Sequence, residues 1–272
     1  MGESKNRILF IDLFMAKIIL HADDFGFDKD SCEATIECFE KGALTSASIM
    51  PTCSATDMAI HYASQHNEFS FGTHLTFVDG LVPVIKEREN SLLVNGFFAP
   101  SNVVRMRAML FRLNIKDIVN EMKAQIKILE NEGIAVSHLD SHGHLHKFPS
   151  FLLALKQIKK ERPEIRIRRS QTIFIHPHQL GPRSLLNLVF DKYISYYFNT
   201  TDQFYMPANS MDTNWAEQLM NIVDKLPDSA TVEIGVHPGH VEKWRQQEYD
   251  DILTFATYIR DSNHKLISWK DI

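Results

Sequence analysis

Short apolar runs along the chain alternate with longer segments in which apolar residues recur at helical spacing. The segment 116–132 shows the helical pattern most clearly, because Ile118, Met122, Ile126 and Leu129 share one face. The same criterion predicts further helices over 30–41, 55–66, 149–161, 215–225 and 249–260. Strands are predicted over 17–22, 45–50, 69–76, 136–142, 165–169, 231–237 and 265–269.

This alternation of strands and helices predicts an α/β fold, with a parallel sheet and the helices outside it. About seven such units in 272 residues favour a single domain built as a closed or nearly closed barrel. A doubly wound open sheet is the alternative, although no GxGxxG sequence follows the first strand to support a dinucleotide-binding fold. The stretches 77–115 and 170–211 lack clear periodicity, and aperiodic segments of that length are often lids or walls of a site.

Residues 1–14 precede the alternating strands and helices. The run 8–14 is apolar, but Asp12 interrupts it, and it is far shorter than the about 20 residues that a membrane span needs. No small-residue cleavage site follows it, which argues against a signal peptide. We interpret residues 1–14 as an N-terminal extension, with Met15 as an alternative start, and assign 15–272 to the barrel domain.

Composition narrows the classes of function. Hydrophobic residues make up 44% and charged residues 23% of the chain, as in ordinary globular proteins. A net charge of −5 gives no electrostatic reason to expect nucleic acid or an anionic membrane as partner, and a small neutral substrate fits it better. Cys32, Cys38 and Cys53 form no CxxC pair and are odd in number, so we expect free thiols and a cytoplasmic location.

Ionisable residues gather at the C-terminal ends of four predicted strands, which form the active-site face of α/β barrels. One strand runs into Asp23 and Asp24, another carries His74, and a third ends at His237. Gly26 supports a sharp turn after the acidic pair, where two adjacent carboxylates can share one site. In such a pair, one carboxylate can bind a metal ion while its neighbour accepts a proton from water.

The fourth strand end is rich in histidine. Alternate positions of an extended chain point to the same side, so one surface would receive every second residue while the strand lasts. Those residues are His138, Asp140, His142, His144 and His146. Because one ion takes few protein ligands and a catalytic site keeps a position open for water, we expect only some of the imidazoles to be ligands.

Five motifs together carry a family resemblance. In chain order they are HADDFG at 21–26, TSASIM at 45–50, GTHLTF at 72–77, HLDSHGHLH at 138–146 and GVHPGH at 235–240. This combination resembles the YdjC-type carbohydrate deacetylase family, which includes chitooligosaccharide (diacetylchitobiose) deacetylases. The resemblance implies a distorted (β/α) barrel and one divalent metal ion per chain.

The same resemblance implies a role for individual residues. Asp24, His74 and His142 match the metal ligands of the family. Asp23, the first carboxylate of the pair, matches the base, and His237 of the late His-Pro motif matches the acid.

Substrate contacts are expected from three further residues. Arg166 resembles a substrate-side arginine that follows the fifth strand of the family, and Asp140 and His144 belong to the histidine-rich motif. Two positions depart from the family pattern: His21 stands where many members have Asn, and Gly143 replaces a histidine. These departures leave the metal ligands intact and leave the identity of the sugar open.

The expected function is therefore a metal-dependent hydrolase that removes an N-acetyl group from an amino sugar or a short oligosaccharide such as diacetylchitobiose. Two imidazoles and a carboxylate suit zinc or another transition ion. Magnesium prefers an oxygen-rich shell, yet it is often assigned to the family, so both ions stay open. The expected partner is a small acetylated sugar, with neither nucleic acid nor membrane, and a homodimer stays open as well.

Two other classes of function compete with this interpretation. Barrel phosphoesterases and cyclic amidohydrolases usually carry His-x-His on their first strand, where this chain has His21, Ala22 and Asp23. A sugar-binding protein without catalysis would be expected to have lost Asp23 or His237, and both are present.

Overall fold

The computed structural model describes residues 15–86, 90–176, 180–207 and 214–272, so the interpreted extension at 1–14 lies outside the described part. Its main sheet has eight strands, and every pairing in that sheet is parallel. The strands are β1 Lys17–Phe25, β2 Ser46–Ile49, β3 Ser70–Leu75, β6 His138–Ser141, β7 Arg166–Ile167, β8 Gln203–Tyr205, β9 Thr231–Val236 and β10 Lys265–Leu266.

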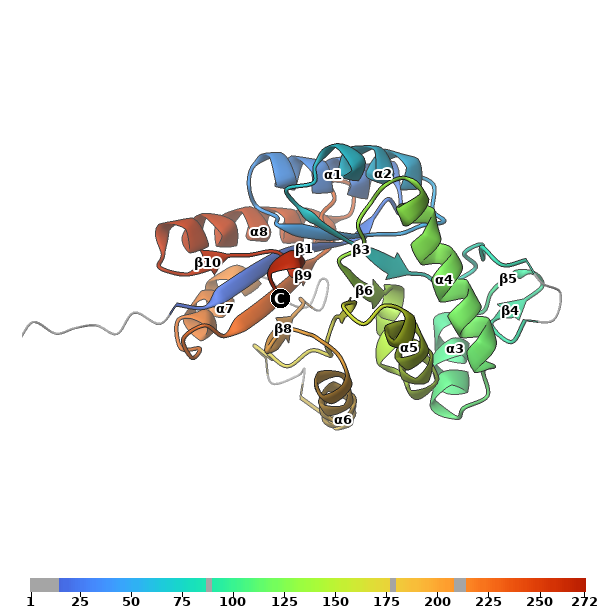
Figure 1. Cartoon of the computed structure of the whole chain (residues 1–272). Helices are drawn as coiled ribbons and strands as arrows, with labels where there is room; N and C mark the ends of the chain where they lie inside the picture. Colours follow the sequence, from blue (N-terminus) through green and yellow to red (C-terminus); the bar gives the residue numbers. More distant parts are fainter. Residues whose placement is uncertain (1–14, 87–89, 177–179, 208–213) are drawn as a thin grey trace, which may run out of the picture.

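The order of the strands identifies the architecture. Along the sheet they run β7-β6-β3-β2-β1-β9-β8, and β10 pairs with the start of β1. From β1 the chain therefore adds strands on one side as far as β7. It then forms β8 and β9, and β9 pairs with the other side of β1. The sheet is curved and the helices lie outside the curve (Figure 1), whereas a doubly wound sheet carries helices on both faces. The predicted distorted barrel is confirmed, with an isolated bridge between Arg166 and Asn199 linking β7 to the segment before β8.

Eight α-helices are described. They are α1 Lys29–Glu40, α2 Thr56–Gln65, α3 Ser101–Met109, α4 Ile115–Asn131, α5 Pro149–Glu161, α6 Pro182–Tyr197, α7 Trp215–Val223 and α8 Lys243–Asp261. Shorter elements are the hairpin of β4 Leu93–Val94 and β5 Phe97–Phe98, and the 3₁₀ segments η1 His142–Lys147 and η4 Trp269–Asp271. None of the helices in the described ranges is long and apolar enough to cross a membrane.

The differences from the predicted elements have physical causes. Helix α8 begins at Lys243 rather than at 249, because Arg245 and Glu248 are buried polar residues that hide the amphipathic pattern of its first turns. Helices α3 and α6 lie in the two aperiodic stretches. The last strand ends at Leu266 instead of continuing to 269, since the chain turns into η4.

The two faces of the curved sheet differ in chemistry. On β1, Ile18 and Leu20 belong to the hydrophobic core that packs under the outer helices, together with Cys32 and Cys38. These two cysteines and Cys53 are free thiols. The alternate residues His21 and Asp23 point into the barrel, where His21 lies 3.5 Å from Asp23 and 3.9 Å from Glu233 of β9. The interior of the barrel is therefore polar and charged. The candidate site lies at the end of the barrel that is formed by the C-terminal ends of the strands.

Candidate active site

Three side chains from three elements meet where β1, β3 and β6 end. The Oδ1 atom of Asp24 lies 3.3 Å from Nε2 of His74 and 2.9 Å from Nδ1 of His142. Potential ligand atoms of the three residues all lie within 4.8 Å of one another. Bonds of 2.0–2.1 Å at tetrahedral angles separate two ligands by about 3.3–3.4 Å, so this donor set fits one divalent ion.

The end of β1 brings both carboxylates of the acidic pair to this site. The register between β1 and β2 shifts between Ala22 and Phe25, and Asp24 adopts a left-handed φ of 57°. This conformation is uncommon for a residue other than glycine and costs about 1–3 kcal/mol. It lets Asp23 and Asp24 line the same cavity, although adjacent strand residues would otherwise point to opposite faces.

Asp140 contacts the ring nitrogen of His74 that faces away from Asp24. Its Oδ1 lies 2.9 Å from Nδ1 of His74, and its Oδ2 accepts a hydrogen bond from Oγ of Ser48 at 3.0 Å. This leaves Nε2 of His74 facing Asp24, which is the usual arrangement of a metal-binding histidine. Burial favours the neutral acid, but the charges of Arg168 and His74 hold the pKa of Asp140 well below its usual range. Because Asp140 is completely buried, our expectation that it contacts substrate is wrong.

The arginine of the site is Arg168. Its Nη1 donates to Oδ2 of Asp23 at 2.7 Å and lies 2.5 Å from Oδ2 of Asp140, while Nη2 donates to Oε1 of Glu233 at 2.7 Å. Arg166 instead donates from Nε to the carbonyl oxygen of Ile272 at 2.7 Å, so its expected place beside the substrate is wrong. Residues two apart on a strand share a face but lie about 6.6 Å apart along it, so only the later arginine reaches the site.

His237 faces Asp23 from the end of β9, with Nε2 4.0 Å from Oδ2. Its other ring nitrogen, Nδ1, lies 3.2 Å from Oε2 of Glu248, which also accepts the backbone N–H of His237 at 2.6 Å. Burial by itself would lower the pKa of His237, but the carboxylate of Glu248 outweighs it and the pKa is raised. The ring is therefore held with Nε2 toward the cavity and favoured in its protonated form.

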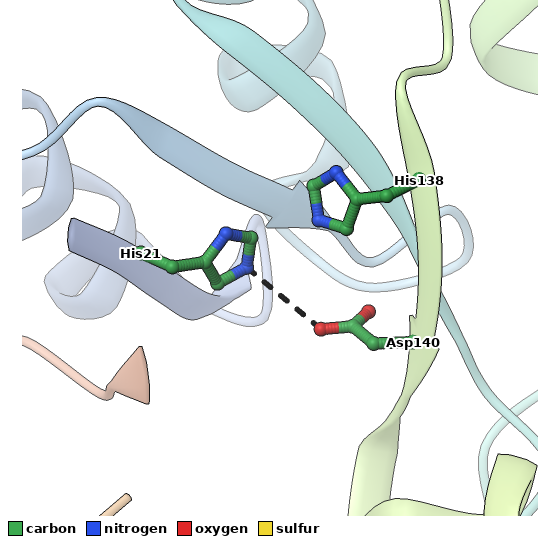
Figure 2. A group of neighbouring side chains, drawn as sticks. All are labelled: His21, His138 and Asp140. Atoms are coloured by element: carbon green, nitrogen blue, oxygen red, sulfur yellow. Dashed lines mark ion pairs between the residues drawn. The ribbon is translucent and has the colours of Figure 1, made fainter. Parts of the chain in front are cut away.

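The first histidines of the two motifs lie deeper in the barrel. Figure 2 shows His21 of β1 turned toward Asp140 of β6, with Nε2 3.7 Å from Oδ2, and His138 beside them. Burial lowers the pKa of His138 to about 3 and that of His21 well below its usual range, so both rings are neutral. A second ion does not fit here, because both oxygens of Asp140 are already engaged and the charge of Arg168 adjoins them.

A cavity of about 470 Å³ lies over the group of Asp24, His74 and His142. It is lined by the potential ligands, by Asp23 and His237, and by His144. The two aperiodic stretches supply other parts of its wall. Their contributions are Asp79, Arg105, Gln171, Met206 and Pro207. The half-buried ring of Trp244 adjoins His237, with centroids 5.7 Å apart, and presents an aromatic surface to the cavity.

Several residues of the site were missed in the sequence. Arg168 carried a signal, because it stands two positions after Arg166 on the same predicted strand face. Glu248 and Trp244 carried none, since they lie in the part of α8 that the periodicity did not include. Arg245 comes from the same turns, and its Nη2 donates to Oδ2 of Asp24 at 2.9 Å.

Comparisons with known proteins identify the family of the chain. The family model described as YdjC-like protein matches residues 17–267. A carbohydrate deacetylase of Geobacillus stearothermophilus is 27% identical, covering 82% of this chain and 80% of its own. A carbohydrate deacetylase of Clostridium beijerinckii is 25% identical, covering 94% of this chain and all of its own.

Two solved structures share the fold. A protein of Enterococcus faecalis that was proposed to act in cellobiose-phosphate cleavage superimposes with a TM-score of 0.77 at 20% identity, over 94% of this chain and 98% of its own. A lactam utilization protein of Thermus thermophilus gives a TM-score of 0.52 at 12% identity, over 93% of this chain and 99% of its own. At these identities the likeness establishes the fold alone.

Proposed function

The chain belongs to the YdjC-like family, and from that premise we propose that it is a metal-dependent deacetylase, which removes the N-acetyl group from an amino sugar or a short oligosaccharide such as diacetylchitobiose. One observation carries the proposal. The group of Asp24, His74 and His142 opens on a cavity that Asp23 and His237 also line. The names of the curated relatives support the same activity.

Hydrolysis of an amide makes three demands, because the carbonyl is a poor electrophile and the amine a poor leaving group. The site must activate water, stabilise an oxyanion and protonate the departing nitrogen. A divalent ion held by Asp24, His74 and His142 would supply Lewis-acid chemistry toward water and the acetyl carbonyl. Zinc and magnesium both remain candidates for that ion.

Asp23 is the proposed base. Its carboxylate adjoins the metal ligand Asp24, and Arg168 anchors one of its oxygens at 2.7 Å. The anchor fixes the orientation of the carboxylate, so that it can accept a proton from a water molecule at the neighbouring site. Arg168 is completely buried and does not reach the substrate, which makes it a positioning residue.

His237 is the proposed acid. It lines the same cavity as the potential ligands, and Glu248 raises its pKa and keeps the proton on the ring. Its Nε2 faces Asp23 at 4.0 Å, so the two groups can serve the two ends of one scissile amide bond. His144 and the ring of Trp244 would contact the sugar, since flat apolar faces of sugars pack well on aromatic rings.

The test is acetate release from a panel of N-acetylated monosaccharides and disaccharides, with metal-stripped protein and protein reloaded with zinc or magnesium as separate samples. We expect release from at least one sugar, loss on stripping and recovery on reloading. A panel of phosphate esters is assayed in parallel. Phosphate release without acetate release would overturn the proposal in favour of a phosphoesterase.

The free thiols lead us to propose a cytoplasmic setting for this activity.

A further inference from the structure

A second cavity, of about 520 Å³, adjoins the first, and both are lined by Arg105, Gly143 and His144. Its walls come from α3, from η1 with the residue that follows it, and from α6. A volume of this size holds a further part of a ligand whose sugar occupies the first cavity. The chemistry of the second cavity should therefore report what the acetylated sugar is attached to.

Two cations line this cavity, and no acidic side chain of the described residues pairs with either of them. Arg105 donates from Nη2 to the carbonyl oxygen of Gly143 at 3.0 Å, and Lys147 follows on η1. Burial and the charge of Arg105 lower the pKa of Lys147 to about 8. None of the described residues that line the cavity is acidic. Two like charges held together in a half-buried site form a place for an anion, and arginine and lysine are the residues that commonly bind phosphate.

Apart from Asn102, His144 and Asn187, the other side chains of the wall are apolar. Phe148 and Phe190 pack together with ring centroids 5.8 Å apart and line the cavity with Met109. Further apolar side chains on α3, just after it and on α6 are 40–66% exposed, and Met106 and Leu186 among them also line the cavity. These residues are Met106, Leu110, Phe111, Leu185, Leu186 and Val189. A helix such as α6, with apolar residues on its exposed face as well as its buried one, normally has that face covered.

We propose that the substrate is an acetylated amino sugar joined through a phosphodiester to an apolar chain, with the phosphate bound by Arg105 and Lys147 and the apolar chain lying between α3 and α6. The inference rests on the proposed function, because it names the substrate class of that same site. The two adjoining cavities are the evidence for this inference. The acetyl group meets the metal ligands in the first cavity, and the cations and apolar side chains line the second.

The kinetic test uses four derivatives of N-acetylglucosamine: the methyl glycoside, the octyl glycoside, the 1-phosphate and the octyl ester of the 1-phosphate. We expect kcat/KM to be highest for the octyl phosphodiester and lowest for the methyl glycoside. Lys147→Gln and Arg105→Gln should each reduce the advantage of the phosphodiester over the octyl glycoside by about ten- to hundredfold, mainly through KM. Leu186→Ser should reduce the advantage of the octyl over the unesterified phosphate.

Lys127→Gln, which removes the same charge from an exposed position on α4, is the matched control and should leave these ratios unchanged. Equal kcat/KM for the methyl glycoside and the octyl phosphodiester would overturn the inference, while the deacetylase activity would stand. A loss of equal size toward all four compounds in the Gln variants would overturn it as well.

A binding measurement separates the two proposals. Octyl phosphate is titrated into the full-length protein and into Lys147→Gln and Lys127→Gln by calorimetry. Weaker binding to Lys147→Gln alone supports the anion site, even if no sugar releases acetate and the proposed function fails. Equal binding to all three proteins, or no binding to any, overturns the anion site whatever the outcome of the acetate assay.

Discussion

Arg168 and Asp23 are joined by a hydrogen bond of 2.7 Å between Nη1 and Oδ2, although 145 residues separate them in the chain. The same guanidinium contacts Asp140 and Glu233, so one buried cation lies among three buried carboxylates. The charges in the barrel interior and the orientation of the proposed base therefore depend on a single side chain.

Replacing Arg168 with Met should lower the free energy of unfolding by about 3–5 kcal/mol, because it leaves buried carboxylates without their partner. Chemical denaturation at neutral pH measures the effect. Arg166→Met, on the same strand, is the control and should cost about 1 kcal/mol, since it removes hydrogen bonds to backbone carbonyls only. Equal losses in the two variants would contradict the central position of Arg168.

Asp23→Asn should retain bound metal and lose about 10²- to 10⁴-fold in kcat, because the amide cannot accept the proton from water. Metal content by mass spectrometry and steady-state acetate release are measured on the same preparation. Asp57→Asn, at an exposed position of α2, provides the matched control. Full activity of Asp23→Asn would refute its assignment as the base.

His142→Ala should lose most of its metal after dialysis, because it removes one of three proposed ligands. The exposed His61 of α2 supplies a control, and His61→Ala should keep its metal. Addition of zinc or magnesium should raise the melting temperature of the His61 variant and not that of the His142 variant, since only an ion that binds the folded state stabilises it. Unchanged metal content in His142→Ala would remove this residue from the ligand set.

Glu248→Gln should move the alkaline limb of the pH–rate profile to lower pH. The acid must be protonated, so activity falls as pH rises through the pKa of His237, and the negative charge of Glu248 raises that pKa. The amide keeps an oxygen for the backbone N–H of His237 but lacks the charge, so the pKa falls. A profile with an unchanged alkaline limb would show that another group is the acid.

Gly72→Ala should destabilise the protein by about 1–3 kcal/mol, because a Cβ at this position would lie 2.5 Å from the ring of His138. That ring has nowhere to move, since it stacks on Trp269 with centroids 4.8 Å apart. Gly181→Ala is the comparison, as no described atom beyond its chain neighbours lies within 4 Å of its added Cβ, and its effect should stay within about 0.5 kcal/mol. Similar stabilities of the two variants would contradict the close packing.

The sequence predicted some parts of the molecule well for a local reason. Helix α5 spans the predicted 149–161, and β2, β3 and β9 lie within their predicted ranges, because each shows its periodicity within its own residues. Helix α6 was not predicted, since its exposed face is as apolar as its buried face and no period stands out. The first turns of α8 were missed because their polar residues are buried by charge pairing with distant parts of the chain.

By itself, the sequence determined most of the strands and helices in their order, favoured the parallel barrel over a doubly wound sheet, and gave the short list of residues from which a metal site can be built. These follow from local pattern and from motifs at strand ends. Only the tertiary structure decided which residues of that list are potential ligands and which support other residues. On β6 and just after it, His138, Asp140 and His142 occupy successive heights in the barrel, as a stacked ring, a support for His74 and a potential ligand. Alternation assigns all three to one face, but height along the barrel axis and the partners brought there from other strands set the role of each.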